Sequence, residues 1–371
     1  MRDFCDASYM KDLVRNRVVN GIFLQLVLYM DDIEIVNPIG SHTKKHKVTM
    51  IYFTLANIPP EFRSKYEAIQ LLAVVKSQDV KEFGLGKILH DFVETMNRLN
   101  TTGIDFSVND RNVTVWGGLI IAPADTPAAQ YLGGFKEGVG LSNKVCRTCN
   151  TSRNEMKLKF LDADFQKRTT DQHLERLNLL TQMTTMAAKY WSKTWGINGR
   201  SPLLDIHGID LAACLVQDPM HILTEGLLSK EVCLILYNFI AVEKYFTLAF
   251  LNNALGGFSY TYLEEKNKPE KIKSDDLLNG KLKQTSASLL ILCCILPIVI
   301  GKKVPTENSK WKNFLRIVQI TLLSTSPYAS EDTAAELEQL IYTHHCEFKK
   351  DYPKSPLTPK FHYLVHIPNR Y

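Results

Sequence analysis

The sequence predicts an α/β core followed by a long, mainly helical region. In the first third of the chain, short apolar runs rich in β-forming residues alternate with apolar residues at helical spacing. After Asp125, strand patterns become rare while helical patterns continue. The 371 residues suffice for one large domain or two ordinary ones. A composition of 45% hydrophobic and 22% charged residues is typical of a folded globular chain, and it excludes a disordered, collagenous or coiled-coil protein.

Four apolar runs in the first third are predicted to be strands. They cover residues 23–30, 48–55, 68–75 and 113–122. The first is expected to stop at the neighbouring acids Asp31 and Asp32, and the last at a Pro-Ala-Asp sequence that contains Asp125. Between the third and fourth runs, residues 85–99 carry apolar side chains three and four positions apart, which predicts an amphipathic helix.

Five later segments have the pattern of helices. They cover residues 171–195, 220–237, 287–300, 311–323 and 331–348, and the first is expected to stop at Gly196. The polar stretch 264–273 reads as a solvated loop or linker. The most apolar run, residues 287–301, is interrupted by Pro297 and is shorter than the roughly 20 residues that a membrane span needs. We therefore expect a buried helix there and no membrane partner.

The net charge and the cysteine content give information on the partners of the protein and on its cellular compartment. Lys and Arg number 44 and Asp and Glu 39, so the formal net charge of +5 is too small to identify a partner, although it would not repel a polyanion. The eight cysteines are scattered, and the first 20 residues are mixed and charged, without the pattern of a signal peptide. These features predict an intracellular, reducing compartment and a protein that is not secreted.

Acidic residues stand at the expected ends of two strands. Asp31, with Asp32 beside it, follows the first strand and Asp125 follows the fourth. Carboxylates at the carboxyl edge of neighbouring strands lie where open α/β sheets bind ligands, and two of them could hold Mg²⁺. The alternative is that these aspartates only terminate strands, as aspartate often does in loops. The pattern alone leaves both interpretations open.

Two residue pairs have the spacing of zinc ligands. Cys146 and Cys149 form a Cys-x₂-Cys pair, which is half of a tetrahedral zinc site, and His362 and His366 lie one helical turn apart, as in the other half of Cys₂His₂ sites. Because 213 positions separate Cys149 from His362, a shared ion would join distant parts of the chain. The alternative is two unrelated pairs, one of reduced core thiols and one of histidines on an amphipathic turn.

A third candidate is the pair His221 and Glu225, four positions apart on a helix predicted to begin after Pro219. The pair could serve catalysis, but an ordinary surface or capping pair is the simpler interpretation. The sequence has no glycine-rich phosphate loop and no Gly-x-Ser-x-Gly motif, so it does not support a nucleotide-binding or hydrolase function.

Several short motifs follow one another along the chain. They are Tyr29-Met30-Asp31-Asp32 with Asn37-Pro38-Ile39-Gly40, then Asn57-Ile58-Pro59-Pro60, Trp116 to Asp125, Gly133-Gly134-Phe135, the cysteine pair, Asp218-Pro219-Met220-His221, and Pro359-Lys360-Phe361-His362 to His366 with Pro368. Their order resembles that of CACTA (EnSpm-like) transposases, which belong to the DDE class. The resemblance covers residues from about 25 to 368, and its single motifs are less specific than their order.

The resemblance implies an RNase H-like core with a mixed sheet over residues 1–135 and a zinc-stapled, mainly helical insertion region over residues 136–371. Asp31 matches the first catalytic acid, with Asp32 as a stand-in, and Asp125 matches the second; these acids would bind Mg²⁺ or Mn²⁺. The cysteine and histidine pairs match the ligands of one structural Zn²⁺. The implied partner is the DNA of transposon ends, with a homodimer as a further option, and the implied location is the nucleus.

The sequence departs from this family at the third acid. In the family a glutamate follows the histidine pair on a helix, whereas residues 367–371 contain no acid. Glu225 could replace it only if the helical region folds back onto the strand edge. We therefore expect a transposase-derived protein with impaired catalysis, or else a non-enzymatic zinc-stabilised module that binds DNA or protein. An unrelated metabolic enzyme would be expected to carry a cofactor motif.

Overall fold

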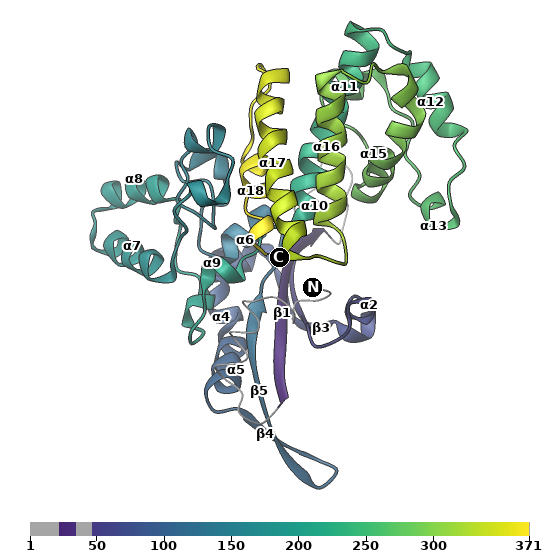
Figure 1. Ribbon diagram of the computed structural model, residues 1–371. Helices are drawn as coiled ribbons and strands as arrows, with labels where there is room; N and C mark the ends of the chain where they lie inside the picture. Colours follow the sequence, from purple (N-terminus) through teal and green to yellow (C-terminus); the bar gives the residue numbers. More distant parts are fainter. Residues whose placement is uncertain (1–21, 35–46, 371) are drawn as a thin grey trace. The chain divides into compact units, whose positions relative to one another are not determined.

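The computed structural model describes residues 22–34 and 47–370, and it divides the chain into two compact units (Figure 1). The first, here called the sheet unit, contains the chain up to Arg153 together with Phe165–Asp218. The second, the helical unit, contains Asn154–Asp164 and the chain from Pro219 onward. The boundary predicted after residue 135 separates a catalytic core from an insertion. The division into compact units does not test that prediction. The motif at residues 37–40 lies outside the described residues.

The sheet unit is built on a five-stranded mixed sheet, as the predicted α/β class requires. Its strand order is β3-β2-β1-β5-β4, with bounds Gln70–Lys76, Lys47–Leu55, Ile22–Glu34, Arg111–Ile121 and Ile104–Val108. β1, β2 and β3 pair antiparallel, β5 pairs parallel with β1, and β4 pairs antiparallel with β5. The chain therefore makes one crossover, between β3 and the β4–β5 hairpin.

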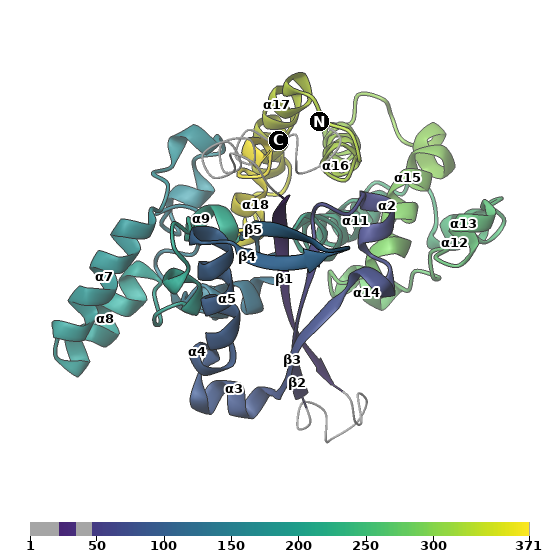
Figure 2. The same cartoon turned by 90° about the horizontal axis from the view of Figure 1, so that it is seen from below.

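Helices α3 (Ser77–Phe83), α4 (Leu85–Ile88) and α5 (His90–Thr101) form this crossover. α5 buries Phe92, Val93, Met96 and Leu99 in the same core as Leu26, Leu28 and Met30 of β1. Figure 2 shows these helices along one face of the sheet. A parallel strand pair needs a crossover that packs on the sheet. The apolar stripe of α5 provides that packing, and it allows the chain to return so that β5 pairs with β1.

Three sequence predictions in this unit need correction. β1 does not stop at Asp31 and Asp32 but continues to Glu34, because β2 supplies hydrogen-bonding partners for exposed polar residues. The helix predicted over residues 85–99 is broken at Leu89 into α4 and α5. β4 was not predicted, although Asn109 and Asp110, both at positive φ (50° and 59°), connect it to β5 in the two-residue turn that such residues favour.

The rest of the sheet unit is helical. It contains α6 (Thr126–Leu132), α7 (Thr170–Gln182), α8 (Thr185–Trp195) and α9 (Leu211–Cys214). α7 and α8 replace the single helix predicted over residues 171–195, because Thr184 caps α8 by accepting a hydrogen bond from the backbone N–H of Ala187. The predicted stop at Gly196 is confirmed by its left-handed conformation, with φ of 72°.

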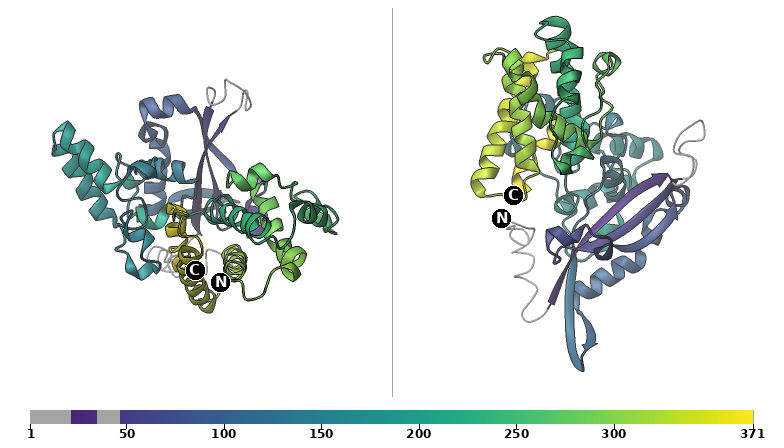
Figure 3. Two further views of the ribbon diagram at one scale, coloured as in Figure 1. Left: turned by 90° about the horizontal axis from the view of Figure 1, so that it is seen from above. Right: turned by 90° about the vertical axis from the view of Figure 1, so that its right-hand side faces the viewer.

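The helical unit confirms the remaining helix predictions to within a few residues. Its main helices are α10 (Pro219–Ile222), α11 (Ser229–Tyr237), α15 (Ser286–Ile300), α16 (Ser309–Ser324), α17 (Glu331–Asp351) and α18 (Pro359–Leu364), with the shorter α12 (Leu248–Gly256), α13 (Tyr262–Glu265) and α14 (Ser274–Leu278). α16 and α17 lie side by side (Figure 3). Between α10 and α11 the chain forms a π-helix, η7 (Leu223–Leu228), which the sequence pattern did not reveal.

One stretch of the described chain, Ser286–Lys303, is long and apolar enough to cross a membrane by length and composition alone. Leu292, Leu296 and Ile300 of this stretch are fully buried in the helical unit. α15 contacts α12, α16 and η7, whereas Ile298 is 67% exposed, so the helix is buried on one side only.

We expect the substitution Gly134→Ala to destabilise the sheet unit. Gly134 has φ of +70°, and a Cβ there would lie 2.1 Å from the carbonyl oxygen of Gly199. Strain and overlap together should lower the free energy of unfolding by about 2 kcal/mol or more in a denaturant titration. Gly86→Ala is the control, because a Cβ at Gly86 meets nothing within 4 Å. Equal stabilities for the two variants would contradict this account of Gly134.

Candidate metal centre

The cysteine pair lies on a buried loop of the sheet unit. Cys146 and Cys149 are 1% and 0% exposed. The backbone N–H of Thr148 donates to Sγ of Cys146 at 3.3 Å, and the side-chain amide of Gln217 lies 3.8 Å from the same sulfur. Burial raises the pKa of Cys149, as does its hydrogen bond with Cys146, while the charge of Arg168 opposes that rise. A buried thiol of this kind loses its proton most readily when a metal ion binds to its sulfur atom.

Arg168 holds the cysteine loop in place. Its Nε donates to the carbonyl oxygens of Cys146 at 2.9 Å and Cys149 at 3.2 Å, and Nη2 donates to the carbonyl of Trp195. Burial lowers the pKa of Arg168 to about 10. None of its interactions within the described residues is with a carboxylate, so its buried positive charge faces the two sulfur atoms instead. That charge favours thiolates, the form in which cysteine binds metals.

The histidine pair lies in the helical unit. His362 belongs to α18, which opens with Pro359 in its first turn, and His366 follows the end of that helix. Nδ1 of His366 contacts a carboxylate oxygen of Asp162, and the side-chain amide of Asn369 donates to the other oxygen. Because Nδ1 can donate its hydrogen to Asp162, Nε2 of His366 keeps a lone pair for a metal ion. No sequence pattern pointed to Asp162, which lies 204 positions from His366.

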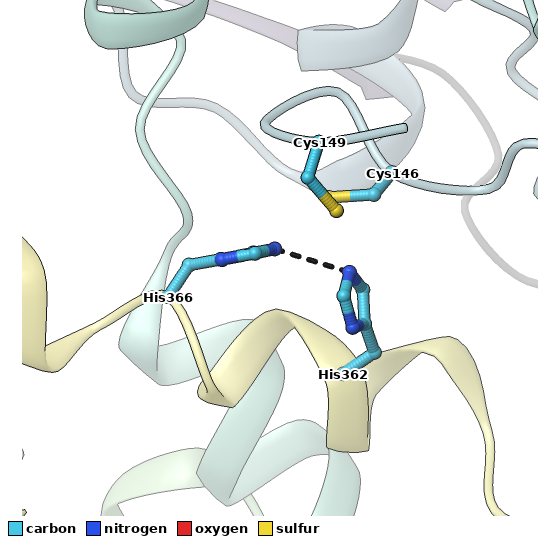
Figure 4. Close-up of side chains that lie close together, drawn as sticks. All are labelled: Cys146, Cys149, His362 and His366. Carbon is cyan, nitrogen blue, oxygen red and sulfur yellow. Dashed lines mark hydrogen bonds between the residues drawn. The ribbon is translucent and has the colours of Figure 1, made fainter. Parts of the chain in front are cut away.

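The four predicted ligands form one buried group. One ligand atom from each of Cys146, Cys149, His362 and His366 lies within 4.8 Å of all the others, and Figure 4 shows the two sulfurs and the two imidazoles facing a common point. The Nε2 atoms of the two histidines are 3.0 Å apart. This group could hold a metal ion. A second group among the described residues, His90, Asp91 and Glu94 on α5, is fully exposed, and such surface groups are common without a metal.

The acids Asp31 and Asp125 lie toward the same ends of the adjacent parallel strands β1 and β5, Asp31 within β1 and Asp125 beyond the end of β5. Val27 of β1 pairs with Ile121 of β5, and each aspartate lies four residues beyond its strand's member of that pair. Both strands run in the same direction, so both acids belong to one edge of the sheet. No group of three candidate metal-binding side chains in the described part of the chain includes either aspartate.

Two of the three strand-end acids also have structural roles. Oδ1 of Asp125 accepts from the backbone N–H of Ala128 at 2.7 Å and so caps α6. Oδ1 of Asp32 accepts from the hydroxyls of Thr49 at 2.6 Å and Ser77 at 3.1 Å. Asp31 is exposed, and its charge adds to the effect of burial in raising the pKa of Tyr52.

The pair His221 and Glu225 forms in the helical unit, with 3.5 Å between His221 Nε2 and Glu225 Oε2. The hydroxyl of Ser286 donates to Oε1 of Glu225 at 3.1 Å, and Lys360 donates to the carbonyl oxygen of Glu225 at 2.9 Å. Glu225 belongs to the π-helix η7, an irregularity that often marks a functional site. These contacts equally suit an ordinary surface pair that joins α18 to η7, so the simpler interpretation of His221 and Glu225 stays open.

His173 of α7 is a buried histidine that the sequence did not single out. Neither ring nitrogen has a hydrogen-bond partner, and the ring packs edge-on against Phe135. Burial, together with the positive charges of Arg168, Arg176 and Arg200, lowers the pKa of His173 to about 4. The neutral ring is therefore the form present in the folded unit at neutral pH.

We expect His173 to make the sheet unit less stable in acid. Its pKa is near 6.5 in the unfolded chain and about 4 in the folded one. Between these values the unfolded chain binds more protons, so stability falls as the pH drops below 6.5, by about 1.4 kcal/mol for each unit of pKa difference. His173→Leu should flatten the dependence of unfolding free energy on pH between 4 and 6.5. An unchanged slope in that variant would show that other groups cause the acid sensitivity.

Comparison with known proteins adds no further site residues. No protein-family model matches the sequence, and no curated protein matches it. The donor atoms described above are therefore the basis on which a function is proposed.

Proposed function

We propose that this protein is a transposase-derived, DNA-binding protein of the DDE recombinase class, stabilised by one zinc ion. The observation that carries the proposal is the meeting of Cys146 and Cys149 with His362 and His366 in one buried group. The motif order predicts that meeting, across 213 positions of sequence. An interpretation as two unrelated pairs gives no reason for it.

The donor set favours zinc over other metals. Two thiolates and two imidazoles are the ligands of closed, tetrahedral structural zinc sites, and all four here are buried. The Asp162 carboxylate on Nδ1 of His366 is the outer partner that such sites commonly provide. A closed set of four protein ligands leaves no open position for a substrate, so the ion would contribute stability and would take no part in chemistry.

The sheet supports an RNase H-like origin. Three antiparallel strands are followed by a helical crossover to a hairpin whose second strand, β5, runs parallel with β1. The two acids lie toward the same ends of these central strands. Carboxylate oxygens are the ligands that Mg²⁺ or Mn²⁺ would use at Asp31 and Asp125. Such ions would supply the charge stabilisation that phosphodiester cleavage and strand transfer require in intact relatives.

We propose that the chain of 371 residues cleaves DNA poorly. Phosphoryl transfer needs two well-placed ions, and the acids at the strand edge belong to no group of three within the described structure. One carboxylate oxygen of Asp125 also accepts the hydrogen bond that caps α6. The further implications of the resemblance, namely transposon-end DNA, a homodimer and a nuclear location, remain predictions.

The second candidate is a zinc-stabilised module that binds DNA or protein without catalysis. The structural roles of Asp125 and Asp32 favour it, because each accounts for an aspartate at the strand edge without any metal ion. The two candidates share the zinc site and differ in whether Asp31 and Asp125 act on a phosphodiester.

Protein purified without chelators should contain one zinc ion per chain by elemental analysis. Asp162→Asn should weaken zinc binding about 10- to 100-fold, because the amide no longer accepts strongly from His366. Asp164→Asn is the matched control, since Asp164 is exposed and accepts only from the backbone of Leu161. Absence of zinc in the wild-type protein, or equal affinities in the two variants, would contradict the proposed site.

A nicking assay with Mg²⁺ or Mn²⁺ on supercoiled DNA should show little cleavage by the wild-type chain. Asp31→Asn and Asp125→Asn are the controls, and asparagine is chosen at position 125 because it still caps a helix. Traces of nicking that persist in both variants would come from a contaminant. Strong cleavage that both variants abolish would mean that the catalytic site is complete, and Glu225→Gln would then test the third acid.

A further inference from the structure

Among the buried ionisable side chains of the helical unit, three that are not proposed zinc ligands lie in contact with one another. They are Glu231 of α11 and the neighbours His344 and His345 of α17, which are 2%, 0% and 0% exposed. Burying ionisable groups is costly unless they are paired. The structure pairs them with one another, and the chain of contacts ends on the backbone of α18.

The contacts form a single line. Nε2 of His344 lies 2.8 Å from Oε1 of Glu231, and the Nδ1 atoms of His344 and His345 are 2.9 Å apart. Nε2 of His345 lies 2.8 Å from the carbonyl oxygen of Phe361. The backbone of His344 is held as well, because Nδ2 of Asn313 donates to its carbonyl oxygen.

The partners determine where the hydrogens lie. A carbonyl oxygen only accepts, so Nε2 of His345 must carry a hydrogen. In a neutral His345, Nδ1 is then an acceptor, and Nδ1 of His344 donates to it. Nε2 of His344 lies 2.8 Å from Oε1 of Glu231, and the two atoms are not aligned as a regular hydrogen bond. Because two bare atoms at that distance would repel each other, we infer one more proton between them. The three side chains with that proton have no net charge.

The surroundings agree with this assignment. Burial lowers the pKa of His345 well below its usual value, and the charge of His344 lowers it further, so His345 is the neutral ring. Near Glu231 lie Lys230, the phenol of Tyr352 and the thiol of Cys293, and the pKa values of Tyr352 and Cys293 are both raised, first by burial. A neutral line of groups avoids leaving an uncompensated charge in this interior.

The last contact of this line, between His345 and the carbonyl oxygen of Phe361, lies next to the candidate metal ligand His362. Phe361 directly precedes His362 in α18, a helix of only six residues. The N–H of Val365, which would donate to Phe361 in a regular α-helix, donates to the carbonyl of His362 instead. The Phe361 carbonyl is thus left for His345, and the Phe361 ring packs on Phe348 with centroids 4.7 Å apart. So short a helix depends on such tertiary contacts for its position.

We propose that Glu231, His344 and His345 form a neutral, proton-bearing relay that positions α18, and with it His362, for metal binding. The inference rests on the proposed zinc site. The three side chains are positioning residues, since none of them belongs to the four-ligand group.

Nitrogen-15 NMR of the metal-free protein tests the relay without zinc. His345 should be the tautomer with hydrogen on Nε2, and Nδ1 of His344 should be protonated, with both hydrogens exchanging slowly. A bare Nε2 on His345 or a bare Nδ1 on His344 would overturn the relay. If the wild-type protein binds no zinc, the proposed function fails, but this measurement still decides the relay.

Zinc competition with a chromophoric chelator tests the positioning role. His345→Leu should weaken zinc binding about 10- to 100-fold, and His345→Gln should recover most of that loss because its amide can donate to the Phe361 carbonyl. His173→Leu is the control, since it removes a buried imidazole that has no hydrogen bonds. Wild-type affinity in His345→Leu would overturn the positioning role.

Glu231 offers a second comparison that remains informative if His345→Leu does not fold. Glu231→Gln keeps a neutral group that can donate to Nε2 of His344, whereas Glu231→Leu removes the partner. We expect near wild-type zinc affinity and melting temperature for the glutamine variant and losses in both for the leucine variant. Equal losses in the two variants would show that the line needs a charged carboxylate, which contradicts a neutral relay.

Discussion

The parallel pairing of β1 with β5 is the constraint on which the sheet unit depends. Parallel neighbours cannot be joined by a tight turn, so the chain must leave the sheet after β3 and return through a packed crossover. The buried stripe of α5 makes that crossover stable. Because the two strands point the same way, Asp31 and Asp125 lie toward the same edge, and α6 with its capping aspartate begins there.

Buried polar groups are the second organising feature, and each is satisfied in a different way. Arg168 donates to carbonyl oxygens around the cysteine loop, Asp162 accepts from His366 and Asn369, and Glu231 lies 2.8 Å from His344. His173 is the exception among these, and the acid sensitivity expected of it follows from its missing partners. Removing one member of such a set leaves the other uncompensated, which is more costly than losing an exposed pair.

These features separate stability from chemistry in the proposed function. The four candidate metal ligands are all buried, whereas the acids at the strand edge include the exposed Asp31. A chain that retained the four candidate metal ligands but lost the function of the acids would keep its fold and lose its catalytic activity. The short segment Asn154–Asp164 belongs to the helical unit although its neighbours in sequence belong to the sheet unit, and it brings Asp162 to the histidine pair.

The sequence by itself determined the elements whose signals are local. Apolar runs and helical spacing located most strands and helices, Gly196 ended α8, and the spacing of Cys146 with Cys149 and of His362 with His366 identified both halves of the candidate metal group. Only the tertiary structure decided what depends on partners distant in sequence. The continuation of β1 past Asp32 needed β2, the carbonyl oxygen of Phe361 in α18 became a partner of His345, and Asp162 became a partner of His366 across 204 positions. Such pairings leave no periodic pattern in a sequence, because the free energy that favours them arises only when both segments are folded.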